Sequence, residues 1–205
     1  VAFVVSVGIA VPNVVGLPQG TAQSAITSAN LAVGTVTMAN STTVAIGNVI
    51  SQNPAAGTNV AAGSAVALVV SLGASVPNVV GITQGNAQTA ITNAGLTVGT
   101  VTSANSASVS IGNVISQNPA AGTNVEPGST VAFVVSLGTA VPNVVGLTQS
   151  AAQTAITNAG LTVGAITTAS HPSVPTGNVI SQNPGAGSNV APGSAVAFVV
   201  SLGPA

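Results

Sequence analysis

An internal repeat limits what this chain can fold into. The string VPNVVG begins at residues 11, 76 and 141, and GNVISQNP begins at residues 47, 112 and 177, so both recur every 65 residues. Such self-similarity at a fixed period is typical of arrays in which each repeat is one structural unit. We therefore expect tandem modules rather than one large domain, with repeat 1 at 11–75, repeat 2 at 76–140 and repeat 3 at 141–205.

The residues before the first repeat form a partial copy of a repeat end. VAFVVSVGIA at 1–10 is similar to VAFVVSLGPA at 196–205. We interpret residues 1–10 as the last strand of a preceding repeat. Because a lone apolar strand leaves its backbone groups unpaired, two readings stay open. Either an upstream repeat is missing, or this strand completes a sheet in a neighbouring chain by strand addition.

The first half of each repeat predicts an extended segment followed by a helix. In the second repeat the residue before Pro77 avoids helical backbone angles, so 76–81 is extended. Thr83 is a residue type that caps helices, and apolar residues then follow at helical spacing. Gly95 is the expected left-handed end of this helix. Asn30 of the first repeat stands at the same position, and asparagine is the other residue type that tolerates this conformation.

The second half predicts three strands, at 97–102, 113–117 and 130–137, with a tight turn at 120–129. The fold class is therefore α+β. We expect three small tandem modules, each with one helix packed on a three-stranded β-sheet, in a beads-on-a-string or filamentous array. In the closing strand of the third repeat, the residues expected to face the core are Val196, Phe198, Val200 and Leu202.

The scarcity of charge excludes whole classes of function. The chain has no Lys or Arg, one acidic residue, Glu126, and one histidine, His171. Nucleic-acid binding requires cations, metal sites require clustered ligands, and acid–base catalysis requires a titratable pair. We therefore expect no enzyme, no cofactor, no metal site and no nucleic-acid partner. No apolar run approaches the roughly 20 residues of a membrane-spanning helix.

The two titratable side chains are interpreted as incidental. His171 falls in a variable loop, where we expect an ordinary loop residue rather than a ligand or a pH switch, and Glu126 falls in a turn. Since folding depends on pH only through titratable groups, we expect the fold to be insensitive to pH between about 2 and 10.

Several strings resemble PASTA modules, the extracellular repeats of bacterial penicillin-binding proteins and Ser/Thr kinases. They are VPNVVG, NAGL, GNVISQNPAAGTNV and PGSTVAFVVSLG. The resemblance implies one helix on a three-stranded sheet, an extracellular or cell-surface location and the binding of peptidoglycan fragments. Typical members carry many charged residues on the helix and strands. Here the corresponding helix positions hold the uncharged residues Gln88, Thr89, Thr92 and Asn93. No binding residue of the family is therefore carried over to this chain.

The outer face of the closing strand is more apolar than a solvated face requires. A surface without charge lacks the repulsion that keeps proteins apart. We therefore expect this face to be covered by a neighbouring module or chain, although Ala and Val also tolerate exposure. The expected assembly interface consists of Val1, Phe3, Val5, Val7, Ala67, Val69, Ala132, Val134, Ala197 and Val199.

Two principal functions follow from these features. The first is a structural component of an extracellular filament, fibre or cell-surface stalk, whose partner is the chain itself. The second is a cell-envelope ectodomain that binds peptidoglycan or another cell-wall glycan. A third reading, ice or mineral binding through rows of threonine, finds only one short row in each repeat.

Overall fold

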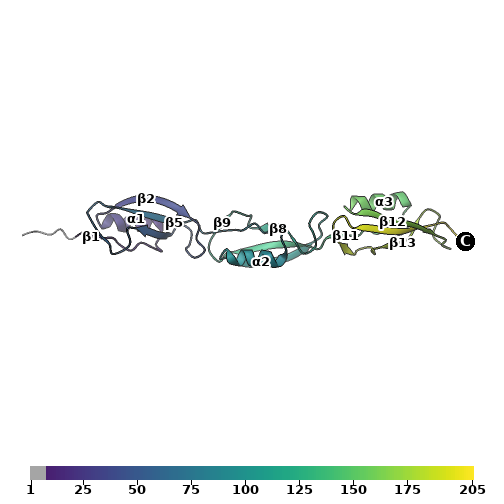
Figure 1. The fold of residues 1–205 in the computed structure, drawn as a ribbon, viewed down its shortest axis with the longest axis horizontal. Helices are drawn as coiled ribbons and strands as arrows, with labels where there is room; N and C mark the ends of the chain where they lie inside the picture. Colours follow the sequence, from purple (N-terminus) through teal and green to yellow (C-terminus); the bar gives the residue numbers. More distant parts are fainter. Residues whose placement is uncertain (1–7) are drawn as a thin grey trace, which may run out of the picture. The chain divides into compact units, whose positions relative to one another are not determined.

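Each repeat folds into one helix and one three-stranded sheet (Figure 1). The computed structural model of the chain describes residues 8–205. The expected α+β class, with the helix packed on the sheet, is confirmed. The strand expected at the N-terminus, with Val1, Phe3, Val5 and Val7, lies outside the described residues.

The elements keep the same order and nearly the same lengths in all three repeats. The first repeat contains β1 (Ile9–Ala10), α1 (Gln19–Ser28), β2 (Ala32–Ala39), β3 (Val49–Asn53), β4 (Asn59–Val60) and β5 (Ala65–Ser71). The second contains β6 (Ala74–Ser75), α2 (Gln84–Asn93), β7 (Thr97–Ala104), β8 (Val114–Asn118), β9 (Asn124–Val125) and β10 (Thr130–Ser136). The third contains β11 (Thr139–Ala140), α3 (Gln149–Asn158), β12 (Thr162–Ala169), β13 (Val179–Asn183), β14 (Asn189–Val190) and β15 (Ala195–Ser201).

The closing strand of each repeat is the centre of its sheet. The strand orders are β2-β5-β3, β7-β10-β8 and β12-β15-β13. In the first and third repeats the closing strand pairs in parallel with the strand after the helix and antiparallel with the other. The last segment of a repeat is therefore flanked on both edges, and only one of its faces is free of the helix.

A two-stranded ribbon in each repeat was not predicted. It pairs β1 with β4, β6 with β9 and β11 with β14. The segment 120–129, expected as a tight turn, thus contains β9. Strands of two residues are too short to show an alternating pattern, so the sequence carried no periodic signal for them. Ile9 and Ala10, which the sequence reading grouped with a preceding repeat, pair here with β4 of the first repeat.

The helix ends follow the predicted chemistry. The backbone N–H of Asn86 donates to Oγ1 of Thr83 over 3.4 Å, which confirms Thr83 as the cap of α2. After the helices, Gly95 and Asn30 adopt φ of 69° and 57°, so the expected left-handed ends are confirmed. The first helix differs at its start, because Pro18 precedes it and supplies no side-chain cap.

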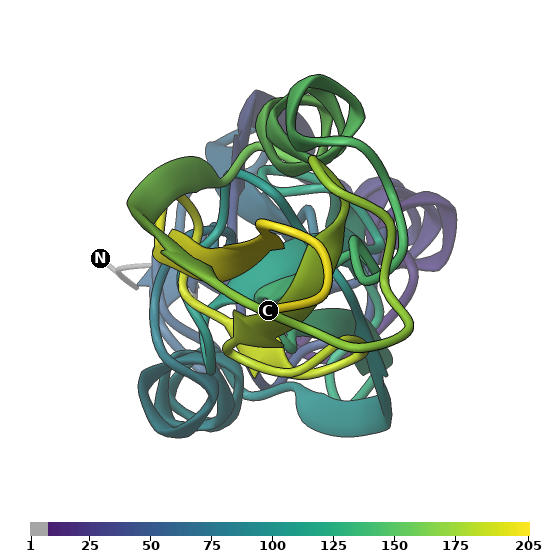
Figure 2. The same cartoon turned by 90° about the vertical axis from the view of Figure 1, so that its right-hand side faces the viewer.

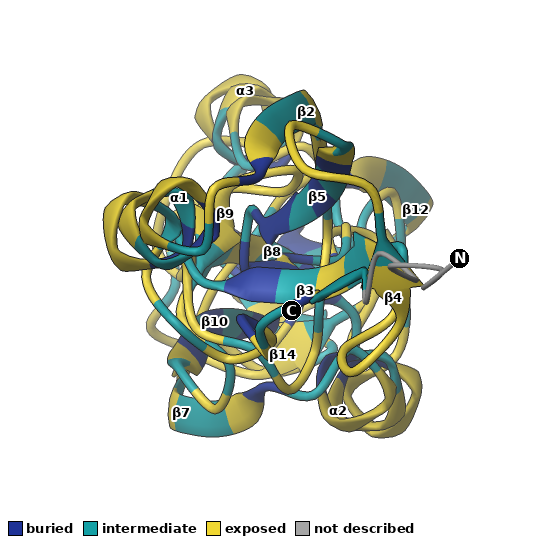
Figure 3. Ribbon diagram, turned by 90° about the vertical axis from the view of Figure 1, so that its left-hand side faces the viewer, coloured by how far each residue is buried: buried dark blue, intermediate teal, exposed yellow. Residues whose placement is uncertain are grey.

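The core lies between the helix and the sheet. In the third repeat Ala152 and Ile156 of α3 are fully buried in one cluster with Val196 and Phe198 of β15. Figure 2 faces this repeat, with α3 in green beside its green-to-yellow strands. Figure 3 shows the same division by burial, since α1 is exposed over most of its turns while β3 and β5 carry buried segments. Only a narrow stripe of each helix is apolar, because one face suffices to cover so small a sheet.

One core prediction was wrong. Val196, Phe198 and Val200 are buried, but Leu202 is 58% exposed and Ser201 is buried instead. Strand β15 ends at Ser201, so the alternation of faces no longer governs Leu202. The Ser201 hydroxyl is buried at low cost because it donates to the carbonyl oxygen of Val174, 2.8 Å away.

Candidate functional site

The most regular motif of the sequence is structural. In GNVISQNP of the third repeat, Oε1 of Gln182 accepts a hydrogen bond from the Val144 N–H over 2.7 Å. Its Nε2 donates to the carbonyl oxygens of Pro142 and Pro184, at 2.9 and 3.2 Å. Gln52 makes the same set of bonds in the first repeat. One amide group thus ties the extended segment before the helix to the loop after β13.

The first asparagine of GNVISQNP has a similar role. Its Nδ2 donates to the carbonyl oxygen of a glycine 32 residues earlier in every repeat. The pairs are Asn48 with Gly16, Asn113 with Gly81 and Asn178 with Gly146. Since these amides are occupied within their own repeat, the fold explains why Asn48, Gln52 and their counterparts recur in GNVISQNP.

The sheet face opposite the helix carries a shallow hollow in every repeat. In the second repeat its volume is about 170 Å³, and in the third and first about 150 and 130 Å³. The lining of the second-repeat hollow comprises Thr100, Thr102, Ser116, Gln117, Asn118, Ala132, Phe133 and Val134. We call this surface, at the corresponding positions of each repeat, the sheet groove. Sites that enclose small molecules usually have about 300–1,000 Å³, so the groove suits a surface contact.

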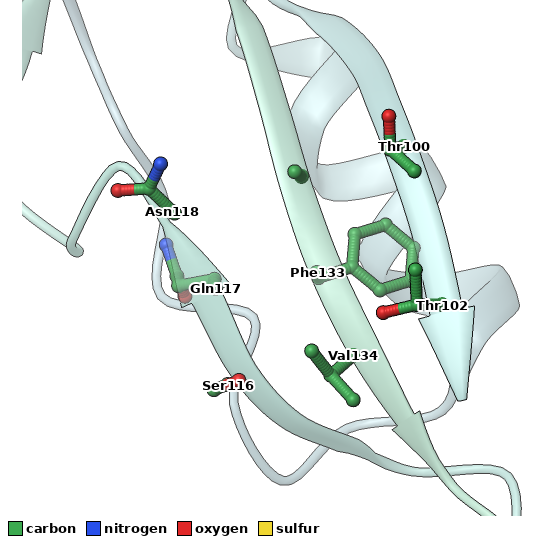
Figure 4. Close-up of a pocket in the computed structure, with 8 residues that line it drawn as sticks. Thr100, Thr102, Ser116, Gln117, Asn118, Phe133 and Val134 are labelled. Atoms are coloured by element: carbon green, nitrogen blue, oxygen red, sulfur yellow. The ribbon is translucent and has the colours of Figure 1, made fainter. Parts of the chain in front are cut away.

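The groove has an apolar floor and hydroxyl or amide rims. Figure 4 shows Thr100 and Thr102 on β7, Val134 on the central strand β10, and Ser116 and Asn118 on β8. The two threonines are exposed, whereas Val134 is half-buried. None of the lining residues is ionisable, so hydrogen bonding and apolar contact are the interactions that this surface offers.

The described residues of the expected interface all lie in these grooves. Ala67 and Val69 line the groove of the first repeat, Ala132 and Val134 that of the second, and Ala197 and Val199 that of the third. Each of these side chains is half-buried. The groove therefore brings together the strand positions that sequence patterning selected, and adds the threonine, serine and asparagine rims that patterning did not select.

The part of the chain that the structure describes offers neither a metal-ligand cluster nor a membrane-spanning helix. Across residues 8–205, no three His, Cys, Asp or Glu side chains gather as a metal site would require. Within the same residues, no helix is long and apolar enough to cross a bilayer.

Glu126 makes a contact that sequence reasoning missed. Its Oε2 accepts a hydrogen bond from the backbone N–H of Ile46, 3.1 Å away and 80 residues earlier in the chain. Nearby, Nδ2 of Asn40 donates to Oδ1 of Asn124 over 3.0 Å. No local pattern signals such partners, because they come from different repeats.

The family follows from comparison with known proteins. A model of the PASTA domain matches residues 9–72, 74–137 and 139–202. The chain belongs to the PASTA domain family. The resemblance inferred from VPNVVG and GNVISQNP is thereby confirmed. PASTA domains are non-catalytic modules, so the matched segments supply no catalytic domain.

Curated relatives of this chain include probable serine/threonine-protein kinases. The chain is 38% identical over 133 residues to the probable serine/threonine-protein kinase PknB of Corynebacterium glutamicum, covering 63% of this chain and 20% of the kinase. It is 34% identical over 200 residues to the probable serine/threonine-protein kinase CE0033 of Corynebacterium efficiens, covering 94% of this chain and 30% of the kinase. The chain therefore spans less than a third of the length of either protein.

Solved structures with similar modules come from Staphylococcus aureus. The three-PASTA-domain of a Ser/Thr kinase aligns with 26% identity and a TM-score of 0.46, covering 94% of this chain and 98% of that one. The entire extracellular region of the Ser/Thr kinase PrkC aligns with 24% identity and a TM-score of 0.37, covering 94% of this chain and 70% of that one.

Proposed function

We propose that this chain is a structural segment of a cell-surface stalk or extracellular filament, in which chains meet through their sheet grooves. Membership of the PASTA family supports a place in the cell envelope, where such modules form ectodomains. The near absence of charge supports a spacer or assembly role over recognition of a charged ligand. Within the described residues, no buried side-chain polar atom lacks a hydrogen-bond partner, so the fold itself occupies these groups.

The observation that carries the proposal is the recurrence of one neutral groove in all three repeats. In every repeat the floor of the groove holds an Ala and a Val of the closing strand, and the rims hold Thr, Ser and Asn from the two flanking strands. A charged partner would lose hydration on this surface without gaining an opposite charge. A second copy of the chain presents the same neutral face with the same 65-residue spacing, so it is the partner whose chemistry and period both match.

Charging the groove floor tests this contact. We expect the triple variant Ala67→Glu, Ala132→Glu and Ala197→Glu to remain dispersed where the unmodified chain self-associates, because three buried carboxylates would have no partners in the contact. Sedimentation velocity over a concentration series measures the difference.

The matched control places the same charges on the outer side of the helices. Thr21, Asn86 and Ala151 are exposed in the first turns of α1, α2 and α3, where carboxylates suit the helix dipole. The variant with glutamate at these three positions should associate as the unmodified chain does. Equal loss of association in both variants would contradict a groove contact, because it would mean that the added net charge alone keeps the chains apart.

Strand addition by the N-terminal residues is a separate part of the proposal. Residues 9 and 10 pair with β4 of their own repeat, so deletion of 1–10 would also remove β1. Deletion of residues 1–7 is the cleaner test. If Val1 to Val7 complete the sheet of a neighbour, this deletion weakens the association, because only the groove contact remains. Unchanged association would exclude strand addition while leaving the groove contact in place.

Glycan binding is the second candidate, because the same groove has rims of hydroxyl and amide groups. Thr100, Thr102 and Asn118 are exposed along one groove and can exchange hydrogen bonds with sugar hydroxyls. Titration with a soluble muropeptide, followed by the amide resonances of β7, β8 and β10, tests this function. Saturable shifts at groove residues would support it, and shifts elsewhere or none would contradict it.

A further inference from the structure

The loop after the first edge strand of each repeat is closed by one side-chain acceptor. In the first repeat Oγ of Ser41 accepts hydrogen bonds from the N–H groups of Thr43 and Val44, at 3.3 and 2.9 Å. In the second repeat Ser106 does the same for residues 108 and 109, at 3.3 and 3.0 Å. Two turns of the same geometry are thus held by a hydroxyl group.

Histidine replaces serine at this position in the third repeat. Nδ1 of His171 accepts hydrogen bonds from the N–H groups of Ser173 and Val174, at 3.3 and 3.1 Å. An imidazole nitrogen can accept only when it carries no proton, so the cap requires the neutral ring with its proton on Nε2. A serine hydroxyl meets no such condition.

The loop closed by His171 is attached to the end of the repeat. The His171 N–H donates to the carbonyl oxygen of Gly203 over 2.9 Å. The Ser201 hydroxyl donates to the carbonyl oxygen of Val174 and accepts from the Gly203 N–H, at 2.8 and 3.0 Å. Opening of the loop therefore releases contacts that hold the chain where it leaves β15.

We propose that residues 171–176 form a pH-sensitive switch, closed while Nδ1 of His171 accepts the two N–H groups and opened when the ring is protonated. Histidine is the side chain that ordinarily changes charge between about pH 5 and 8. Protonation turns Nδ1 into a donor that faces two further donors, so both bonds are lost together. The first two repeats keep their loops closed at every pH because Ser41 and Ser106 do not titrate.

Two other ionisable groups are considered as influences on the protonation of His171. Glu126, the one acidic side chain, lies in the turn after β9 of the second repeat and accepts from the Ile46 N–H. The α-carboxyl group of Ala205 lies two residues beyond Gly203 in this chain. Extending the chain past Ala205 moves that carboxyl group away and separates its effect from that of His171.

NMR spectroscopy of the full chain tests the switch with an internal control. At about pH 8 we expect the ¹⁵N shifts of the His171 ring to report the Nε2–H tautomer. On acidification to about pH 5, solvent exchange of the Val174 amide, corrected for intrinsic rates, should rise two- to tenfold as its one bond to Nδ1 is lost. The Val109 amide, held by Ser106, should show no such rise.

The His171→Ser variant serves as the matched control, because it restores the residue used by the other two repeats. Its Val174 amide should follow Val109 across the whole pH range. The proposal would be overturned by a His171 ring that carries its proton on Nδ1 at about pH 8. It would also be overturned if, in the unmodified chain, the exchange rate of the Val174 amide changed with pH in the same way as that of Val109. Persistence of the pH response in His171→Ser, or its loss when the chain is extended past Ala205, would also overturn it.

Discussion

Asn30 shows how a single residue ends a helix in this family of repeats. Among residues 8–205 it is the non-glycine residue with positive φ, at 57°, where the third repeat has Gly160 at 72°. Because a left-handed conformation costs an ordinary residue about 1–2 kcal/mol, we expect Asn30→Ala to lower the free energy of unfolding by about 1 kcal/mol. Denaturant unfolding measures this. Asn30→Gly, which copies the other repeats, should leave stability unchanged or raise it, and a loss equal to that of alanine would contradict the explanation.

Residue-scale features were predictable where their partners are close in sequence. Thr83 caps an amide three residues away, and Asn30 lies two residues after the end of its helix. Glu126 and Leu202 were not predictable for the opposite reason. The partner of Glu126 is 80 residues away, and the exposure of Leu202 depends on where β15 stops.

At the scale of elements, a glycine sets how closely two strands of the sheet approach. A Cβ added at Gly164 of β12 would lie 3.0 Å from the backbone nitrogen of Ala197 on β15, where the parallel register shifts. Backbone cannot move aside as a flexible side chain can, so Gly164→Ala should lower the free energy of unfolding by about 1–3 kcal/mol. Thermal unfolding monitored by circular dichroism measures the change.

Gly20 of α1 is the matched control for that substitution. A Cβ there meets nothing within 4 Å, and alanine is the better helix former. Gly20→Ala should therefore raise the free energy of unfolding, by up to about 1 kcal/mol. If Gly20→Ala and Gly164→Ala destabilise the chain equally, crowding against β15 is not the cause of the stability loss in Gly164→Ala.

The elements themselves were predictable because their signals are local. Helical spacing before Gly95 and alternation after it predicted the helix and the first strand. The position of the closing strand at the centre of the sheet depends on pairing between distant segments. The ribbon of β6 with β9 was missed because its strands have only two residues each.

At the scale of the whole molecule, stability should hardly respond to pH. With one carboxylate and one imidazole among its side chains, the chain has almost no proton-linked free energy to gain or lose. We expect no cooperative unfolding transition between about pH 2 and 10, and opening of the His171 loop on acidification should lower the thermal unfolding midpoint by only a few degrees. Calorimetry across this range measures it, and a cooperative acid-unfolding transition would contradict the expectation.

The candidate site was predictable only in part. Patterning of the closing strand selected Ala132 and Val134, since alternate residues of a strand share a face. The rims formed by Thr100 and Asn118 come from two other strands, and the order of strands in the sheet is what brings them to the groove.

Electron microscopy of the purified chain at neutral pH tests the central claim most directly. If neutral sheet grooves bind copies of this chain to one another, the field should contain ordered assemblies of many chains with a regular period. The groove-charged variant should show dispersed single chains under the same conditions. The structural function would be contradicted if both samples contained only single chains across the concentration series. Glycan binding would then be the function to test.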